Sequence, residues 1–159
     1  MSRCHLRPGV DIAGLNELAA GHLPGWFGIE VVRVEPGRLS ARLPIRSEML
    51  APNGFLHAAT IVALADTSAG YATIAHQPTG ADGFTTVELK TNFLGTLTEG
   101  VLLCEVTAAH CGRTTQVWDA VVSSEDGRRL ALFRCTQMIL WSRAVVPSAQ
   151  GAPQAPGQE

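Results

Sequence analysis

One acidic residue, Asp66, stands alone in a long apolar segment of the sequence. Between residues 58 and 81 it is the only acidic residue, and the same stretch contains no lysine or arginine. Burying a carboxylate among apolar groups is costly unless it is paired, hydrated or protonated, and a residue kept despite that cost is often functional. Such a carboxylate can act as a general base on water or as a nucleophile on a carbonyl carbon. The alternative is a structural role, as a cap or as the partner of an arginine from the sheet.

His57 precedes Asp66 by nine residues in the same segment. On one α-helix, nine residues place two side chains about 180° apart around the axis and about 13 Å apart along it. The two residues therefore cannot share a site within one chain. If both are catalytic, the site must join the histidine end of one subunit's helix to the aspartate of another, which predicts a dimer with two composite sites. The alternative for His57 is a helix-start residue bonded to a backbone carbonyl.

The segment that carries both residues, 56–75, is expected to form one long helix. It is rich in alanine, has few β-branched residues and contains no proline. It is apolar on nearly every face, so the helix should be buried all round. The Pro-Asn-Gly sequence at 52–54 marks its start, and the Pro-Thr-Gly sequence at 78–80 lies beyond its end.

Strand patterns flank this helix on both sides. Residues 29–35 are rich in β-branched types, Pro36-Gly37 favours a turn, and 39–43 alternate apolar and polar residues, so a hairpin is expected. Four more strands are expected at 84–93, 101–109, 115–123 and 129–141, separated by the turn sequences Glu99-Gly100, Cys111-Gly112 and Asp126-Gly127. A single helix on one face of a bent antiparallel sheet is an α+β fold in which the sheet wraps the helix.

The length of 159 residues suits a single domain, which we place at 1–141. A short leading helix is expected at about 10–21, ended by the His-Leu-Pro-Gly sequence at 22–25. From 142 to 159 the chain holds proline, glycine, glutamine, alanine and serine with almost no core-forming residues. We expect this segment to be a disordered tail.

Composition argues against several classes of function. Net charge is −2 with the basic residues scattered, whereas a nucleic-acid binder normally has a basic patch. No apolar run approaches the roughly 20 residues that span a bilayer, and the first residues lack the apolar core of a signal peptide, so a cytoplasmic protein is expected. Charged residues make up only 16% of the chain, which favours an oligomer that covers some apolar surface.

The four cysteines form no C-x-x-C pair, so neither a zinc knuckle nor a redox motif is indicated. Cys104 and Cys135 lie in apolar strand-like runs and are expected to be buried thiols. The adjacent pair His110-Cys111 lacks the two further ligands of a closed zinc site, so no metal site is expected.

Three motifs in order resemble one known family. The sequence Gly54-Phe55-Leu56-His57-Ala58-Ala59, followed by Asp66-Thr67, resembles the signature of hotdog-fold thioesterases of the PaaI (phenylacetic acid degradation) type, within the 4-hydroxybenzoyl-CoA thioesterase superfamily. In that family a G-x-x-H-G-G stretch opens the central helix, and an acid lies nine positions past the histidine. Residues 86–94 and 109–114 resemble the family's next strand and following hairpin, and the resemblance spans about 28–140.

The resemblance implies an acyl-CoA thioesterase with no cofactor, since CoA is part of the substrate. It implies a homodimer or homotetramer with composite sites, with helices side by side and sheets joined. Backbone N–H groups near Ala58 at the helix start would then form the oxyanion hole, and the partner's Asp66 would be the base or nucleophile. Thr67 and Thr86 are candidates for positioning the water or the carboxylate, and His57 would orient the loop. Each threonine is equally explained as an ordinary helix or strand residue.

Other residues are candidates for binding the substrate. Gly54 lies in the loop before the helix, and Arg113 is a candidate for contacting the CoA phosphates. Arg128 and Arg129 are weaker candidates, because a charge at a hairpin turn is usually only solvated. The acyl pocket could be lined by four aromatic residues, which could equally be core: Trp26, Phe27, Phe55 and Tyr71. The family suggests an arylacetyl group first and medium-chain acyl groups next.

The sequence departs from the family at the helix start. Ala58-Ala59 replaces the usual Gly-Gly, and Ala51 stands where the family has a polar Asn or Gln, so Asn53 is the candidate to take over that role from a shifted loop. Two rival functions follow. One is a hotdog hydratase or dehydratase, which would make or remove a conjugated double bond without releasing thiol. The other is a non-catalytic protein that binds acyl-CoA.

Overall fold

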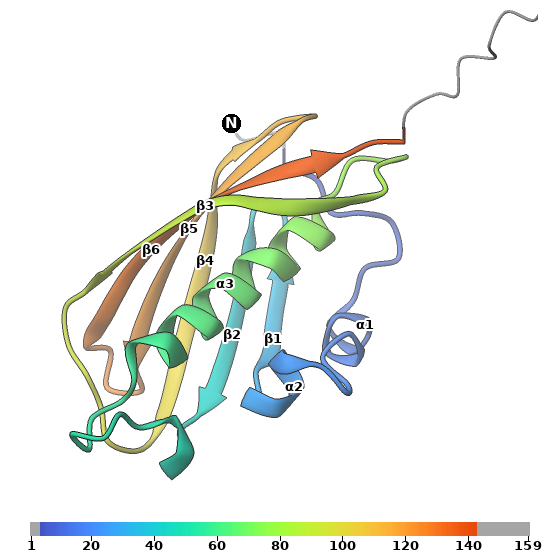
Figure 1. Ribbon diagram of the computed structural model, residues 1–159. Helices are drawn as coiled ribbons and strands as arrows, with labels where there is room; N and C mark the ends of the chain where they lie inside the picture. The colour runs from blue at the N-terminus through green and yellow to red at the C-terminus, as the bar shows by residue number, and fades with distance from the viewer. Residues whose placement is uncertain (1–3, 143–159) are drawn as a thin grey trace, which may run out of the picture.

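The computed structural model describes residues 4–142 (Figure 1). The segment predicted to be a disordered tail lies, from residue 143 onward, outside these residues. Six antiparallel strands form one sheet in the order β1-β2-β4-β5-β6-β3. Their bounds are β1 (Glu30–Glu35), β2 (Arg38–Pro44), β3 (Gly83–Phe93), β4 (Val101–Cys111), β5 (Thr115–Ser124) and β6 (Arg129–Leu140). Every predicted strand is confirmed, with its ends displaced by at most two residues.

One long helix, α3 (Ala58–Ala75), lies across the concave face of the bent sheet (Figure 1). Leu64, Ala65 and Ala69 are fully buried against strands whose inward side chains are apolar. The helix is buried over most of its length, as predicted, but its first turn is exposed. A bent antiparallel sheet wrapped around one central helix is the hotdog fold, so the predicted fold class is confirmed. No helix within residues 4–142 is long and apolar enough to cross a membrane.

The predicted short leading helix is present, but the N-terminal region differs from the prediction in two respects. The leading helix, α1 (Ile12–Glu17), is shorter than predicted; Asp11 caps it, and its Asn16 side chain bonds both backbone groups of Val31 in β1. A second helix, α2 (Leu23–Phe27), forms where a break was expected. Pro24 is tolerated there because it lies in the first helical turn, where a missing N–H breaks no intrahelical bond.

A disulfide joins Cys4 to Cys111, with Cα atoms 5.5 Å apart and 107 positions between them in the chain. The backbone N–H of Arg7 donates a hydrogen bond to the carbonyl of Ala75 at 2.7 Å, so the N-terminal segment crosses the C-terminal end of α3. The other two cysteines are buried free thiols, as predicted. Burial raises the pKa of Cys104 to about 12 and that of Cys135 to about 11, which keeps both thiols protonated.

Strand β3 forms one edge of the sheet, paired only with β6. Its outer row of backbone N–H and C=O groups has no strand beside it within residues 4–142. Three apolar side chains of β3 are exposed, Val87 at 57%, Leu89 at 41% and Phe93 at 48%. A long edge strand with exposed apolar side chains is a template for pairing with another chain, unless it is protected by charge, proline or a covering element.

Candidate active site

Asp66 faces a cavity of about 280 Å³ between the middle of α3, the edge strand β3 and the short helix α2. The lining residues are Pro24, Asp66, Thr67, Gly70, Tyr71, Ile74, Phe84 and Thr86. We refer to this space as the Asp66 cavity. Three residues predicted to take part in the chemistry, Asp66, Thr67 and Thr86, are thus brought together by one helix and the neighbouring edge strand.

The Asp66 carboxylate is half-buried, and its Oδ1 atom has no hydrogen-bond partner among the described residues. Burial raises the pKa of this carboxyl above its ordinary value. The structural alternative from the sequence was an ion pair with an arginine of the sheet. No salt bridge to Asp66 forms within residues 4–142, where the three ion pairs involve Arg33, Arg42 and Arg134. A buried carboxylate oxygen without a partner is rare in folded proteins, and it favours a functional role for Asp66.

Tyr71 adds a second unpartnered polar group to the same cavity. Its ring is buried, and its hydroxyl has no hydrogen-bond partner among the described residues. Burial raises the pKa of Tyr71, so the phenol keeps its proton and can donate a hydrogen bond. The sequence identified Tyr71 only as an aromatic lining or core residue. Its hydroxyl could not be assigned a role because its orientation depends on packing against β3.

The start of α3 holds a different set of the predicted residues. His57 is the N-cap, and its Nδ1 accepts a hydrogen bond from the Ala59 N–H at 3.0 Å. His57 is therefore a helix-start residue, as the structural alternative held, but the Nδ1 atom accepts from a backbone N–H where a bond to a backbone carbonyl was expected. Ala58 is the first residue of α3, and its N–H has no acceptor among the described residues, as an oxyanion-hole donor requires.

The loop before α3 is held by local bonds. Asn53 is exposed, and its Oδ1 accepts a hydrogen bond from the Phe55 N–H at 3.2 Å. Gly54 has φ 84°, a left-handed conformation that favours glycine. None of the residues at the start of the helix lines the Asp66 cavity. One chain therefore holds the carboxylate and the free N–H at separate places along α3, as the nine-residue spacing predicted.

Arg113 lies apart from both groups, in the turn between β4 and β5. Its guanidinium stacks on the ring of Trp141, 4.3 Å from the centroid, and it lines another cavity at the far end of α3. Of the predicted aromatic lining residues, only Tyr71 borders the Asp66 cavity. Phe84, Pro24 and Ile74 line it as well, but no sequence pattern marked them beyond their apolar character.

Comparison with known proteins gives consistent results. The family model described as "Thioesterase superfamily" matches residues 53–131. A 1,4-dihydroxy-2-naphthoyl-CoA hydrolase of Listeria monocytogenes is 30% identical over 110 residues, which cover 69% of this chain and 89% of that protein. The proofreading thioesterase EntH of Klebsiella pneumoniae is 30% identical over 131 residues, covering 82% and 95%.

Solved structures share the fold. The crystal structure of a mutant of thioesterase PA1618 from Pseudomonas aeruginosa has a TM-score of 0.80 at 29% identity, covering 85% of this chain and 97% of that one. The PaaI protein of Escherichia coli, from the phenylacetic acid degradation operon, has a TM-score of 0.72 at 21% identity, covering 81% and 91%. The second similarity concerns the fold alone.

Proposed function

The chain belongs to the thioesterase superfamily and is a thioester hydrolase, and we propose that it cleaves an aromatic acyl-CoA whose acyl group enters the Asp66 cavity. The observation that carries this proposal is the pair of unpartnered polar atoms in one small cavity, Asp66 Oδ1 and the Tyr71 hydroxyl. The rings of Tyr71 and Phe84 and the side chain of Ile74 provide apolar walls for a flat acyl group.

The proposed reaction uses Asp66 as a base or as a nucleophile. As a base, it removes a proton from water while the oxygen adds to the thioester carbonyl. The tetrahedral oxyanion is stabilised by the Ala58 N–H of the partner subunit's helix. Collapse of the intermediate breaks the carbon–sulfur bond, and the proton held by Asp66 passes to the CoA thiolate. As a nucleophile, Asp66 attacks the thioester carbonyl, the carbon–sulfur bond breaks and the CoA thiolate leaves, and water then hydrolyses the resulting mixed anhydride to the free acid and the Asp66 carboxylate. Neither route needs a cofactor.

Two residues are proposed to support Asp66 from within the cavity. Thr67 follows it on α3 and Thr86 lines the same cavity from β3, which supports a role for their hydroxyls in positioning the attacking water. At the helix start, His57 is proposed to orient the loop by accepting the Ala59 N–H, which leaves the Ala58 N–H directed at substrate. Asn53 and Gly54 would shape the approach to that N–H.

The working form is proposed to be a homodimer or a pair of dimers joined as a homotetramer. The unpaired edge of β3 and its exposed Val87 and Leu89 supply a surface on which a second copy can add its own β3. Because β3 borders the Asp66 cavity, such pairing brings a second subunit next to the carboxylate. This arrangement would unite the groups that one chain keeps apart.

A cytoplasmic location is proposed because the substrate class, acyl-CoA, is found inside cells. The Cys4–Cys111 disulfide is uncommon for that compartment, where thiols are kept reduced. Rapid alkylation of free thiols in intact cells, followed by mass spectrometry, would establish the state of this pair. Full reduction in the cell would be in accord with the proposed location, and full oxidation would argue for an oxidising compartment.

The proposed activity is tested by assaying the purified protein against phenylacetyl-CoA, a hydroxybenzoyl-CoA and octanoyl-CoA. We expect release of free thiol, followed with a colorimetric reagent, with the highest kcat/KM on an aromatic ester. Preference for octanoyl-CoA would contradict the aromatic substrate. Formation or loss of a conjugated double bond without thiol would identify a hydratase or dehydratase, and binding without turnover would identify an acyl-CoA-binding protein.

Tyr71→Phe is expected to change selectivity among aromatic substrates. The Tyr71 hydroxyl has no partner within residues 4–142, so we expect it to donate a hydrogen bond to a polar substituent on the acyl ring. One such bond contributes about 0.5–1.5 kcal/mol, so kcat/KM for the hydroxylated ester should fall roughly 2- to 12-fold. The value for the unsubstituted ester should stay unchanged. An equal loss on both esters would mean that Tyr71 only packs the cavity wall.

A further inference from the structure

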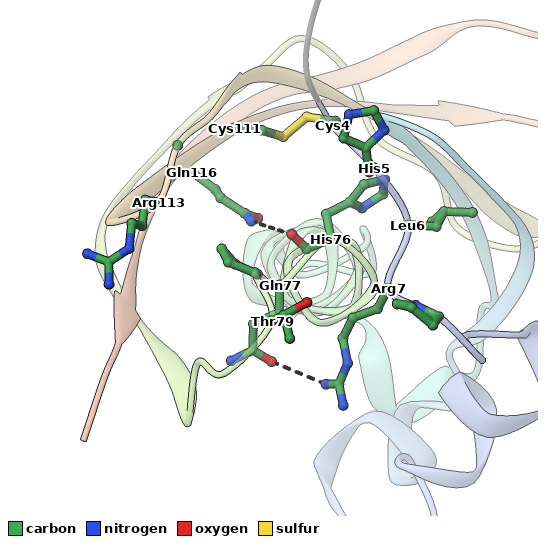
Figure 2. Close-up of a pocket in the computed structure, with 13 residues that line it drawn as sticks. Cys4, His5, Leu6, Arg7, His76, Gln77, Thr79, Cys111, Arg113 and Gln116 are labelled. Atoms are coloured by element: carbon green, nitrogen blue, oxygen red, sulfur yellow. Dashed lines mark hydrogen bonds between the residues drawn. A yellow bond between two sulfur atoms is a disulfide. The ribbon is translucent and has the colours of Figure 1, made fainter.

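We propose that a second cavity, at the C-terminal end of α3, binds a small anionic group, a phosphate or a carboxylate. This cavity has a volume of about 320 Å³ and lies between the N-terminal segment, the residues that follow α3 and the β4–β5 turn (Figure 2). We call it the α3-end cavity. Its volume is within the range of small-ligand pockets. It shares no lining residue with the Asp66 cavity.

The charges around the α3-end cavity have one sign. Its described lining residues include two arginines, Arg7 and Arg113, and no aspartate or glutamate. Arg7 comes from the N-terminal segment and Arg113 from the β4–β5 turn, and Figure 2 shows them on opposite sides of Gln77. Two guanidinium groups on either side of a cavity without a counter-charge favour an anion over a neutral or cationic ligand.

The two side-chain amide oxygens of the cavity wall are already occupied. The Gln116 amide donates to the His76 carbonyl at 2.9 Å, and its own oxygen accepts from Trp118 Nε1 at 3.2 Å. The oxygen of the Gln77 amide accepts from Arg7 at 3.4 Å. A ligand that brings N–H or O–H donors would therefore find no free side-chain amide oxygen here.

The His76 ring is neutral, and both of its nitrogens already take part in hydrogen bonds. Its Nε2 accepts from the Gly37 N–H at 2.8 Å, so the proton is on Nδ1, which donates to the Ala72 carbonyl at 2.7 Å. Burial lowers the pKa of this ring, which keeps it uncharged near neutral pH. His76 therefore forms part of the wall and supplies neither a free donor nor a free acceptor.

Among the described residues of the α3-end cavity, the side-chain groups that still lack a hydrogen-bond partner include several donors. Gln77 is only 8% exposed, yet its Nε2 has no hydrogen-bond partner among the described residues. Arg7 has further N–H groups beyond the one that contacts Gln77. Stacking on Trp141 occupies the face of the Arg113 guanidinium and leaves its N–H groups, which lie in the plane, available. Three sets of donors around one cavity favour an acceptor-rich ligand, and phosphate and carboxylate groups supply several acceptor oxygens.

The helix end itself does not oppose an anion strongly. The terminal carbonyls of α3 carry partial negative charge, but they have partners. The Ala75 carbonyl accepts from the Arg7 N–H at 2.7 Å, and the Ala72 carbonyl accepts from His76. The Cys4–Cys111 disulfide also lines the cavity and ties the segment that carries Arg7 to β4. The two arginines are therefore held in place before a ligand arrives, which reduces the entropy lost on binding.

The test is titration calorimetry of the oxidised, full-length protein with inorganic phosphate, with chloride of equal ionic strength as the blank. We expect saturable binding that weakens about tenfold or more in Arg7→Gln and in Arg113→Gln, since each removes a charge-assisted bond. Gln77→Leu should also weaken it. The matched control is Arg42→Gln, an exposed arginine of β2 that pairs with Glu30 and does not line the cavity, which should bind as wild type does. Heat no greater than the chloride blank, or equal weakening in Arg42→Gln, would overturn the proposal.

A second experiment distinguishes two possible sources of the bound anion. If the cavity takes a free anion, CoA will not displace phosphate. If it takes a phosphate of the CoA substrate, CoA will compete, and Arg113→Gln will raise KM for acyl-CoA but not for the matching phosphate-free acyl-pantetheine. Both results keep the anion site and differ only in its ligand. Phosphate titration needs no turnover, so failure of the proposed hydrolysis and failure of this site are observed separately.

Discussion

Asp66→Asn is expected to lower kcat for acyl-CoA hydrolysis by on the order of 10²-fold or more, because an amide can neither accept a proton from water nor attack the carbonyl. Asparagine has nearly the same shape, so the Asp66 cavity should keep its volume and its apolar walls. Steady-state thiol release from the best ester of the panel measures the effect. KM should change little, since the carboxylate is proposed to act on the transition state and not to hold the substrate.

The same variant should not lose stability. Burial raises the pKa of Asp66 in the folded protein, so the folded state holds the proton more tightly than the unfolded chain does. The ionised side chain therefore costs stability as pH rises from the unfolded pKa through the folded pKa, and above both values the full cost is present. Asp66→Asn removes the charge and should leave the unfolding temperature at pH 7 equal or higher.

A control is available at Asp82, an exposed carboxylate outside the cavity that accepts a hydrogen bond from Ser142 at 2.8 Å. Asp82→Asn should retain wild-type kcat. If Asp66→Asn were as active as wild type while folded and oligomeric, the carboxylate would have no part in the chemistry. The function would then have to be sought in binding of CoA esters.

The features predicted from sequence are those set by local patterns. The alternation of apolar and polar residues, together with the turn residues, predicted the six strands. The alanine-rich stretch without proline predicted α3. Asp66 was identifiable because a lone carboxylate in an apolar helix is costly wherever that helix packs. The separation of His57 from Asp66 followed from helix geometry alone, and the structure places them apart as that geometry requires.

The features missed depend on contacts between distant segments. Cys4 and Cys111 are 107 positions apart, and only the folded chain brings their Cα atoms within 5.5 Å. A role for the Tyr71 hydroxyl can be inferred only from the folded structure, in which β3 lines the same cavity. The short helix α2 was not predicted because a proline usually ends a helix unless it lies in the first turn, as Pro24 does. The anion site at the end of α3 likewise combines residues from three segments.

The composite site gives the second large prediction, and Ala58 offers a selective way to test it. Proline is favoured at the first position of a helix and has no N–H. His57, the residue before it, already has the extended conformation (φ −67°, ψ 135°) that a following proline requires. Ala58→Pro should therefore remove the proposed oxyanion donor without breaking α3. We expect kcat to fall by about 10²–10³-fold, the usual effect of losing one such donor.

Mixed dimers then distinguish a shared site from a site within one chain. Coexpression of Ala58→Pro and Asp66→Asn subunits with different tags yields purified heterodimers. One of their two sites would combine the intact Ala58 N–H of one subunit with the intact Asp66 of the other. We expect about half the wild-type kcat per dimer, although each parent homodimer is nearly inactive. Heterodimers as inactive as their parents would mean that each chain carries a complete site.

The route of assembly is tested on the same heterodimers. Lysine on an exposed edge strand blocks pairing, so adding Val87→Lys and Leu89→Lys to both subunits should yield monomers and abolish the recovered activity. The matched control is Val32→Lys on β1, which is 46% exposed at the opposite edge of the sheet. Sedimentation should find that control still dimeric and active. Active monomers would rule out a shared site, whereas dimers that survive the β3 changes would place the interface on another surface.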